Sequence, residues 1–515
     1  MKGMQQHPFF GYYMSFKIIY LQLYPLELLI RGKHMHELTI SLNPKSKTPL
    51  YEQIYNYIKQ DIQNGRIKAK EKLPSSRALS AHLEVSRSTV DLAYEQLLSE
   101  GYLESVPCKG YYACQIEELY HFGSDRSVKE KTVLQEENSY QYDFTPSGID
   151  LDSFPYGIWR KITRNILLDD NKELFQLGDP MGEWELRETI CSYLHQARGV
   201  NCRPEQVVIG AGNDYLLLLL STILGTNRRI AMETPTYKHA YKIFEQLGYS
   251  LCTIPVDAQG MEVSKLESSG VDIAYVMPSH QYPLGIVMPI KRRLELLAWA
   301  AGREGRYIIE DDYDSEFRYK GKPIPALQGT DQRDSVIYIG TFSKSIAPAI
   351  RISYMVLPEK LLQKCENKIL RFSSTVSRID QMILNQFLKD GYYERHLNRM
   401  RIIYGRRHDI LLGELKKIPG CRIAGENAGV HLLVEFVNGI TEEEGIRRAK
   451  EENIKVYPLS EYEIGEQGGG ITEEKKKCTV ILGYATLSEP EILEAAKRLG
   501  RAWDCSSDLE PLSFS

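Results

Sequence analysis

The stretch Tyr338-Ile339-Gly340-Thr341-Phe342-Ser343-Lys344-Ser345, with Arg351 seven residues after the lysine, decides the fold and the chemistry predicted for this chain. The apolar pattern of a strand is followed by a predicted turn that contains the hydroxyl residues Thr341, Ser343 and Ser345 and the lysine Lys344. The lysine amine can form a Schiff base with an aldehyde, and the arginine can hold a phosphate through two hydrogen bonds. Upstream, Glu310-Asp311-Asp312-Tyr313-Asp314 supplies carboxylates, one of which can keep a pyridine nitrogen protonated.

These are the groups needed to hold pyridoxal 5'-phosphate, and further groups follow other apolar runs. Gly210-Ala211-Gly212-Asn213 can hold a phosphate with its backbone amides, although a tight strand-to-helix turn explains the motif equally well. Tyr237 can stack on a pyridine ring or belong to the core. The loop 278–285, with His280 and Tyr282, can reach a phenolic oxygen. Because five strand ends offer complementary chemistry for one ligand, we expect one cofactor site.

Residues 142–503 alternate short apolar runs with longer helical stretches. This alternation predicts an α/β domain with a mainly parallel sheet flanked by helices, and it places the cofactor groups at the carboxyl ends of the strands. The expected strands include 207–209, 229–232, 274–277, 306–310 and 336–339, and a helix is expected over Tyr215 to Leu224.

Residues 36–114 have the pattern of a winged helix-turn-helix. An amphipathic helix from Pro49 to Gln63 is followed by a second helix that begins at 74–77 and a third that Ser86 caps and Gly101 ends. The segments 102–106 and 110–113 then form a hairpin, the wing. A three-helix packing domain with incidental basic residues is the alternative.

The predicted DNA contacts lie at the helix starts and in the wing. In the major groove Arg87 can read a guanine edge, and the helix starts can bind phosphate. The candidate residues are Ser75, Ser76, Arg77, Ser86, Arg87, Ser88, Thr89, Lys109, Gly110 and Tyr111.

Composition restricts the partners. The formal net charge of -4 over 515 residues gives no global attraction to nucleic acid or membrane, so DNA binding must come from a local patch. The nine cysteines show no C-x-x-C pair or zinc spacing. They predict reduced thiols in the cytoplasm and no metal site.

Three segments are expected to lie outside these modules. Residues 1–35 include the apolar segment 9–30, but Lys17, Pro25 and Glu27 interrupt it, and no cleavage site follows. We expect an over-extended translation start there, with an interfacial or membrane segment as the alternative. The polar residues 115–141 predict a flexible linker, and residues 504–515 a C-terminal tail.

The head motifs Pro-Leu-Tyr-x-Gln-Ile, Leu-Pro-Ser-x-Arg-x-Leu-Ser and Ser-Arg-x-Thr-Val-x-x-Ala-Tyr over residues 49–112 resemble GntR-family winged helices. The wing tip 106–110 departs from that family's small glycine turn, so we expect the helices to contribute more to DNA contact than the wing. Residues 142–503 resemble fold-type I aminotransferases, which implies a smaller C-terminal α+β subdomain. Together the modules resemble MocR/GabR-type regulators.

The resemblance implies a role for each candidate residue and a homodimer in which each head often lies on the partner's body. Lys344 would form the internal aldimine, Asp311 would hold the pyridine nitrogen and Tyr313 the ring hydroxyl, and Tyr237 would stack on the ring. The phosphate would be held by Gly212, Asn213, Thr341, Ser343 and Arg351.

Two positions depart from the aminotransferase pattern. Leu177 stands where a tyrosine often reaches the partner's phosphate, and Ile481 stands where an arginine commonly clamps a substrate carboxylate. An ordinary α-amino-acid substrate is therefore in doubt, because a buried carboxylate without a cation is costly. Lys238, His239 or His431 are candidates to replace the arginine.

Three functions remain open. The favoured one is a DNA-binding transcription regulator that senses pyridoxal phosphate, or an amine or amino acid, through an aldimine at Lys344. The second is a working aminotransferase with an accessory DNA-binding head, so enzymatic activity is left undecided. The third is a DNA-binding protein with an inactive body, which the intact Lys344, Asp311 and Arg351 disfavour.

Overall fold

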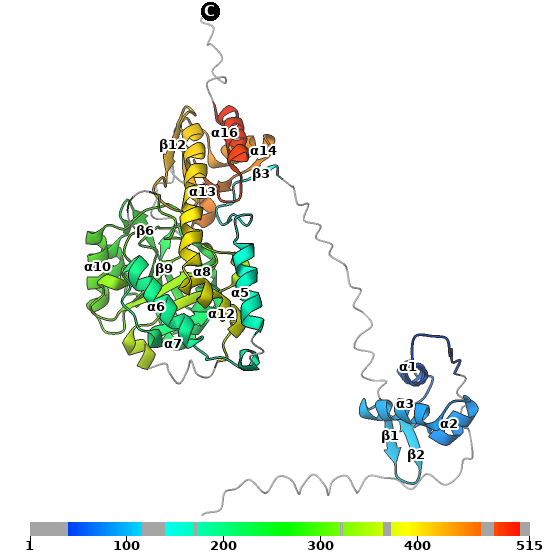
Figure 1. Cartoon of the computed structure of the whole chain (residues 1–515). Coiled ribbons are helices and arrows are strands. Elements are labelled where there is room, and N and C mark those ends of the chain that lie inside the picture. The colour runs from blue at the N-terminus through cyan, green and yellow to red at the C-terminus, as the bar shows by residue number, and fades with distance from the viewer. Residues whose placement is uncertain are drawn as a thin grey trace, which may run out of the picture. The chain divides into compact units, whose positions relative to one another are not determined.

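The computed structural model describes residues 40–115, 140–168, 172–319, 321, 323–363, 372–464 and 478–504. The chain divides into two compact units, Met1–Glu136 and Glu137–Ser515, called the head and the body below (Figure 1). The extension expected at 1–35 lies outside the described residues, as does nearly all of the expected linker and tail. Within the described ranges, no helix is both long and apolar enough to cross a membrane.

The head is a winged helix-turn-helix, as predicted. Its serine caps set the two short helices: Ser75 Oγ accepts from the Ala78 amide and Ser86 Oγ from the Thr89 amide, each at 3.2 Å. The apolar stripes of the helices meet in one buried core that also contacts the wing. Its elements are α1 (Leu50–Gln63), α2 (Ser76–His82), α3 (Arg87–Ser99) and the antiparallel strands β1 (Leu103–Val106) and β2 (Gly110–Ala113).

The body is built on an eight-stranded, mainly parallel sheet with the order β4-β11-β10-β9-β8-β5-β6-β7. The strands β10, β9, β8, β5 and β6 run parallel, and β11 is antiparallel to both of its neighbours. The predicted sheet is therefore confirmed. The strands are β4 (Val207–Gly210), β5 (Arg229–Thr234), β6 (Ser250–Asp257), β7 (Gly260–Met261), β8 (Ile273–Val276), β9 (Tyr307–Asp312), β10 (Val336–Thr341) and β11 (Ser353–Val356).

Helices cover both faces of this sheet because successive strand residues point to opposite sides. In β9, Ile309 packs in the cluster that includes Phe244 of α8, whereas Ile308 packs in the cluster of Trp299 of α10. Both faces are buried, which explains the near-continuous apolar runs in the sequence. The helices are α5 (Tyr156–Leu168), α6 (Trp184–Arg198), α7 (Asn213–Leu224), α8 (Lys238–Gln246), α9 (Val263–Ser268), α10 (Ile290–Ala301) and α12 (Arg378–Lys389).

A smaller α+β part follows the long helix α13 (Tyr392–Leu415), again as expected. Its antiparallel sheet has the order β12-β13-β16-β15 and packs on α14, and Trp503 of α16 meets Phe436 of β13 edge to face. The first strand of the body, β3 (Tyr142–Asp143), pairs with β14 of this part. The remaining elements are β12 (Cys421–Ala424), β13 (His431–Phe436), α14 (Glu442–Glu451), β14 (Ile454–Lys455), β15 (Tyr457–Pro458), β16 (Thr479–Gly483) and α16 (Glu489–Trp503).

Candidate functional site

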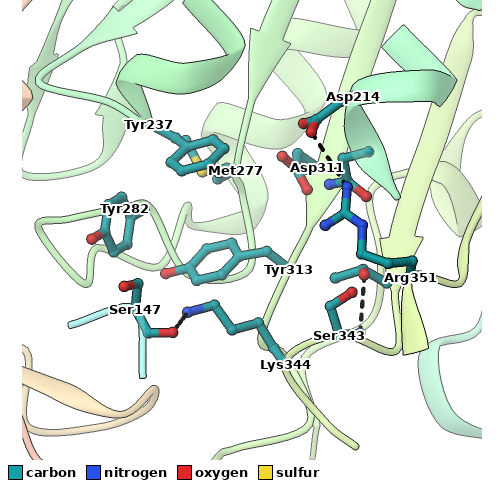
Figure 2. Close-up of a pocket in the computed structure, with 12 residues that line it drawn as sticks. Ser147, Asp214, Tyr237, Met277, Tyr282, Asp311, Tyr313, Ser343, Lys344 and Arg351 are labelled. Atoms are coloured by element: carbon teal, nitrogen blue, oxygen red, sulfur yellow. Dashed lines mark hydrogen bonds and ion pairs between the residues drawn. The ribbon is translucent and has the colours of Figure 1, made fainter. Parts of the chain in front are cut away.

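One pocket of the body lies where the strand ends meet, as Figure 2 shows. Because β4, β5, β8, β9 and β10 all run in the same direction, the residues that follow them reach one edge of the sheet. Of the eleven predicted cofactor residues, all except Gly212 and His280 line it. The lining residues are Ser147, Asn213, Asp214, Tyr237, Met277, Tyr282, Asp311, Tyr313, Thr341, Ser343, Lys344 and Arg351.

Lys344 follows β10 by three residues and points into the pocket (Figure 2). Its Nζ donates a hydrogen bond to the Ser147 carbonyl oxygen at 2.6 Å. Burial lowers the pKa of Lys344 to about 8, and the nearby Asp314 opposes that shift. The lowered pKa leaves more of the amine neutral near pH 7 than an exposed lysine would have, which makes Lys344 a better nucleophile toward an aldehyde.

Asp311 lies near the end of β9 and is almost completely buried. The Tyr275 hydroxyl donates to its Oδ2, while its Oδ1 has no hydrogen-bond partner among the described residues. Burial raises the pKa of Asp311 to about 7, and the neighbouring Asp312 and Asp314 act in the same direction. A buried carboxylate oxygen without a donor at a pocket wall is the group that a protonated ring nitrogen would satisfy, so this residue fits the predicted cofactor.

The other end of the pocket suits an anion. Gly212 has φ 89°, and a Cβ there would collide with the guanidinium of Arg351, which itself has φ 50°. Asn213 begins α7, and the Oδ1 of Asn213 and the Oγ of Ser343 have no hydrogen-bond partner within the described ranges. Free amides at a helix start, an arginine and a hydroxyl are the groups that bind phosphate. The residues present therefore fit pyridoxal phosphate at both ends of the pocket.

Aromatic side chains form the wall between these ends. The rings of Tyr237 and Tyr282 meet edge to face at 6.2 Å, and Tyr282 meets Tyr313 at 5.5 Å. His280 lies outside the lining: its Nδ1 is 3.0 Å from the Tyr313 hydroxyl and 3.0 Å from both oxygens of Asp314. The structure therefore places His280 behind Tyr313, where it can orient that hydroxyl, rather than in the pocket as expected.

Three residues that line the pocket were not predicted from the sequence. Asp214 directly follows the Gly212-Asn213 motif, so its position could have revealed it. Met277 ends the apolar run 274–277, a pattern that predicts a strand and gives no sign of a pocket residue. Ser147 contributes a backbone carbonyl from 197 residues before Lys344, which no local pattern indicates.

The positions that depart from the aminotransferase pattern are also resolved. Ile481 of β16 is fully buried in an apolar cluster with Leu433 and Leu459. Of the proposed substitutes for an arginine, His431 is buried, and burial lowers its pKa to about 4, so the ring is neutral at physiological pH. His239 is exposed and lies 3.1 Å from Asp214. Leu177 is 88% exposed.

In the head, most of the predicted DNA contacts are accessible. Ser75, Arg77, Ser86, Arg87, Ser88 and Lys109 are exposed, and Thr89 and Gly110 are partly so. Two residues are less available than expected. Ser76 is only 5% exposed because it packs into the head at the start of α2, and Tyr111 packs its ring on Tyr94 at 4.8 Å.

Comparisons with known proteins match both parts of the chain. The family described as "Aminotransferase class I and II" matches residues 153–499, and "Bacterial regulatory proteins, gntR family" matches residues 50–112. The kynurenine aminotransferase of Pyrococcus horikoshii, solved with PMP, is similar in structure, with a TM-score of 0.63 and 26% identity over 76% of this chain and 99% of that one.

Two regulators are similar over nearly the whole chain. YdeL of Bacillus subtilis, an uncharacterized HTH-type transcriptional regulator, is 43% identical over 91% of this chain and 99% of its own. MocR of Rhizobium meliloti, a probable rhizopine catabolism regulatory protein, is 29% identical over 90% of this chain and 95% of its own. The chain therefore belongs to the MocR-type transcription regulators, which join a GntR winged helix-turn-helix to an aminotransferase class I and II body.

Proposed function

We propose that this regulator binds pyridoxal phosphate at Lys344 and adjusts its binding to operator DNA when the cofactor, or an amine or amino acid that reacts with it, occupies the body. The observation that carries the proposal is the Oδ1 of Asp311, which has no hydrogen-bond partner in the part of the chain that the structure describes and lies in the same pocket as Lys344 and Arg351. When bound, the cofactor supplies an aldehyde carbon and an electron-withdrawing ring.

Different residues of the pocket would bind different parts of the cofactor. Lys344 would hold the aldehyde carbon, Asp311 would keep a proton on the ring nitrogen, and Arg351 with the start of α7 would bind the phosphate. Tyr237 would cover one face of the ring. The Nζ of Lys344 would give up its hydrogen bond to Ser147 in doing so.

Regulation requires that the ligand bind two states of the protein with different affinities. We infer a cytoplasmic homodimer whose two heads bind two half-sites of one operator, so that a change in the bodies alters how the heads fit the DNA. Arg87 at the exposed start of α3 is the residue we assign to base recognition.

The test combines absorbance with DNA binding on the full-length chain. Pyridoxal phosphate should give the wild type a visible band that primary amines shift, and the same additions should change its affinity for the DNA upstream of its own gene. Lys344→Ala should lose both responses yet still bind that DNA. A band that responds to amines while DNA affinity stays constant would contradict the proposal.

A second function, transamination, is supported by the lowered pKa of Lys344, which suits an amine that also moves protons. The same absorbance experiment separates the two. An aminotransferase would convert the band completely with an amino donor and restore it with a keto acid, at unchanged DNA affinity. The apolar, buried Ile481 weighs against this outcome for α-amino acids.

A further inference from the structure

Asp214 places a carboxylate at the phosphate end of the pocket. It lies in the first turn of α7, and its Oδ2 is 3.3 Å from Nη2 of Arg351, a contact drawn in Figure 2. Its other oxygen, Oδ1, is 3.1 Å from Nε2 of His239. Neither the motif around Gly212 nor the proposed chemistry at Lys344 accounts for an acidic side chain there.

A carboxylate at this point opposes the ligand that the surrounding groups suit. The start of α7 and the guanidinium of Arg351 attract an anion, and a phosphate monoester carries roughly 1.5 to 2 negative charges near neutral pH. Asp214 already uses one of the Arg351 donors. A phosphate that binds Arg351 must therefore displace Asp214 or accept a negative charge beside it, and both cost binding energy.

We propose that Asp214 competes with phosphate for Arg351 and thereby holds the affinity for pyridoxal phosphate low enough for the cofactor to exchange. This inference rests on the proposed function and deepens it, because it makes the phosphorylated vitamer itself a ligand whose concentration the body reads. His239 gives the displaced carboxylate a partner, since it contacts the oxygen that does not face Arg351.

The competition should be specific for ligands that carry a phosphate. Pyridoxal has the same aldehyde and ring but no phosphate, so Asp214 should not affect it. Asp214→Asn keeps the size and hydrogen-bonding capacity of the side chain and removes the charge. Because the Asp214 side chain is half-exposed and lies in the first turn of a helix, the amide should be tolerated by the fold. Glu245→Gln, at an exposed position near the end of α8, makes the same charge change as a matched control.

The experiment is a titration of full-length wild type, Asp214→Asn and Glu245→Gln with pyridoxal phosphate and with pyridoxal, followed by the visible band. Half-exposed charge pairs interact weakly, but the phosphate carries up to about two charges, so Asp214→Asn should bind pyridoxal phosphate about tenfold more tightly. Its affinity for pyridoxal, and both affinities of Glu245→Gln, should match those of the wild type.

The titrations test both the competition between Asp214 and phosphate and the proposed function on which it rests. An unchanged or weaker affinity of Asp214→Asn for pyridoxal phosphate would overturn the competition and make Asp214 a residue that orients Arg351. An equal gain for pyridoxal would also overturn it, because the effect would not involve the phosphate. If the wild type gave no band with either ligand, the proposed function itself would fail, and the two failures are thus distinguishable.

Discussion

Replacing Asp311 by asparagine tests the cofactor site most directly. The side chain is 4% exposed, it accepts a hydrogen bond from Tyr275, and its second oxygen has no partner in the described part of the chain. The substitution keeps the shape and the Tyr275 contact but removes the negative charge. A protonated ring nitrogen would then lie in a buried wall without its counter-ion.

The size of the effect follows from the burial. Removing one partner of a buried ion pair costs about 3–5 kcal/mol. Asp311 lines a pocket that must admit a ligand, so we take the lower end, which corresponds to a roughly 100-fold weaker affinity for pyridoxal phosphate. The measurement belongs at pH 8, above the pKa of about 7 that burial gives Asp311, where the wild-type carboxylate is ionised.

The assay is an equilibrium titration of the visible band, with Glu245→Gln as the control for an unrelated loss of charge. Urea unfolding of both variants should show that the body remains folded. If Asp311→Asn bound pyridoxal phosphate within a factor of about three of the wild type, the carboxylate would not hold the ring nitrogen. The assignment of the pocket as a pyridoxal phosphate site would then lose its main support.

Two further predictions concern stability. Burial raises the pKa of Glu233 from 4.5 to about 7, so this carboxyl group makes the folded body less stable as pH rises between those values. Between pH 4 and pH 8 the unfolding free energy of Glu233→Gln should therefore increase by about 3 kcal/mol relative to that of the wild type, as measured by urea unfolding. Parallel pH profiles of the two proteins would exclude this effect. Ser86→Ala removes the cap of α3 and should destabilise the head by about 1 kcal/mol in thermal unfolding, whereas an unchanged head transition would show that the cap is dispensable.

The elements that the sequence predicted best are those with a strong local pattern. All six residues of β10 are buried and its first four, 336–339, are apolar or aromatic, and the caps Ser75 and Ser86 precede helical periodicity. Parallel strands bring their carboxyl ends together, so Asp311 and Lys344 could be assigned to one site before any contact was known. The predicted helix 215–224 ends at the same residue as α7, but α7 begins two residues earlier and so includes Asn213 and Asp214.

The parts that the sequence did not predict depend on contacts between distant segments. The pairing of β3 with β14 joins Tyr142 to Ile454, and nothing in either two-residue strand indicates its partner. The contact of Lys344 with Ser147 uses a backbone carbonyl, which every residue has. His280 carries the right chemistry for the pocket, but packing against Asp314 turns it away from the lining. Residue type alone therefore overestimates how many polar groups reach a ligand.

The departures from an aminotransferase all leave the covalent chemistry intact. Lys344 and Asp311 line one pocket and fit the proposed cofactor, whereas Asp214 places a negative charge beside Arg351 and Ile481 provides an apolar side chain where a carboxylate clamp was expected. An enzyme that uses the same cofactor in every turnover gains from keeping that cofactor bound. A sensor must instead release its ligand when the concentration falls, because a site that is always full reports nothing. Weakening at the phosphate, with the lysine and aspartate preserved, is therefore the pattern that favours a sensor over both a transaminase and an inactive body.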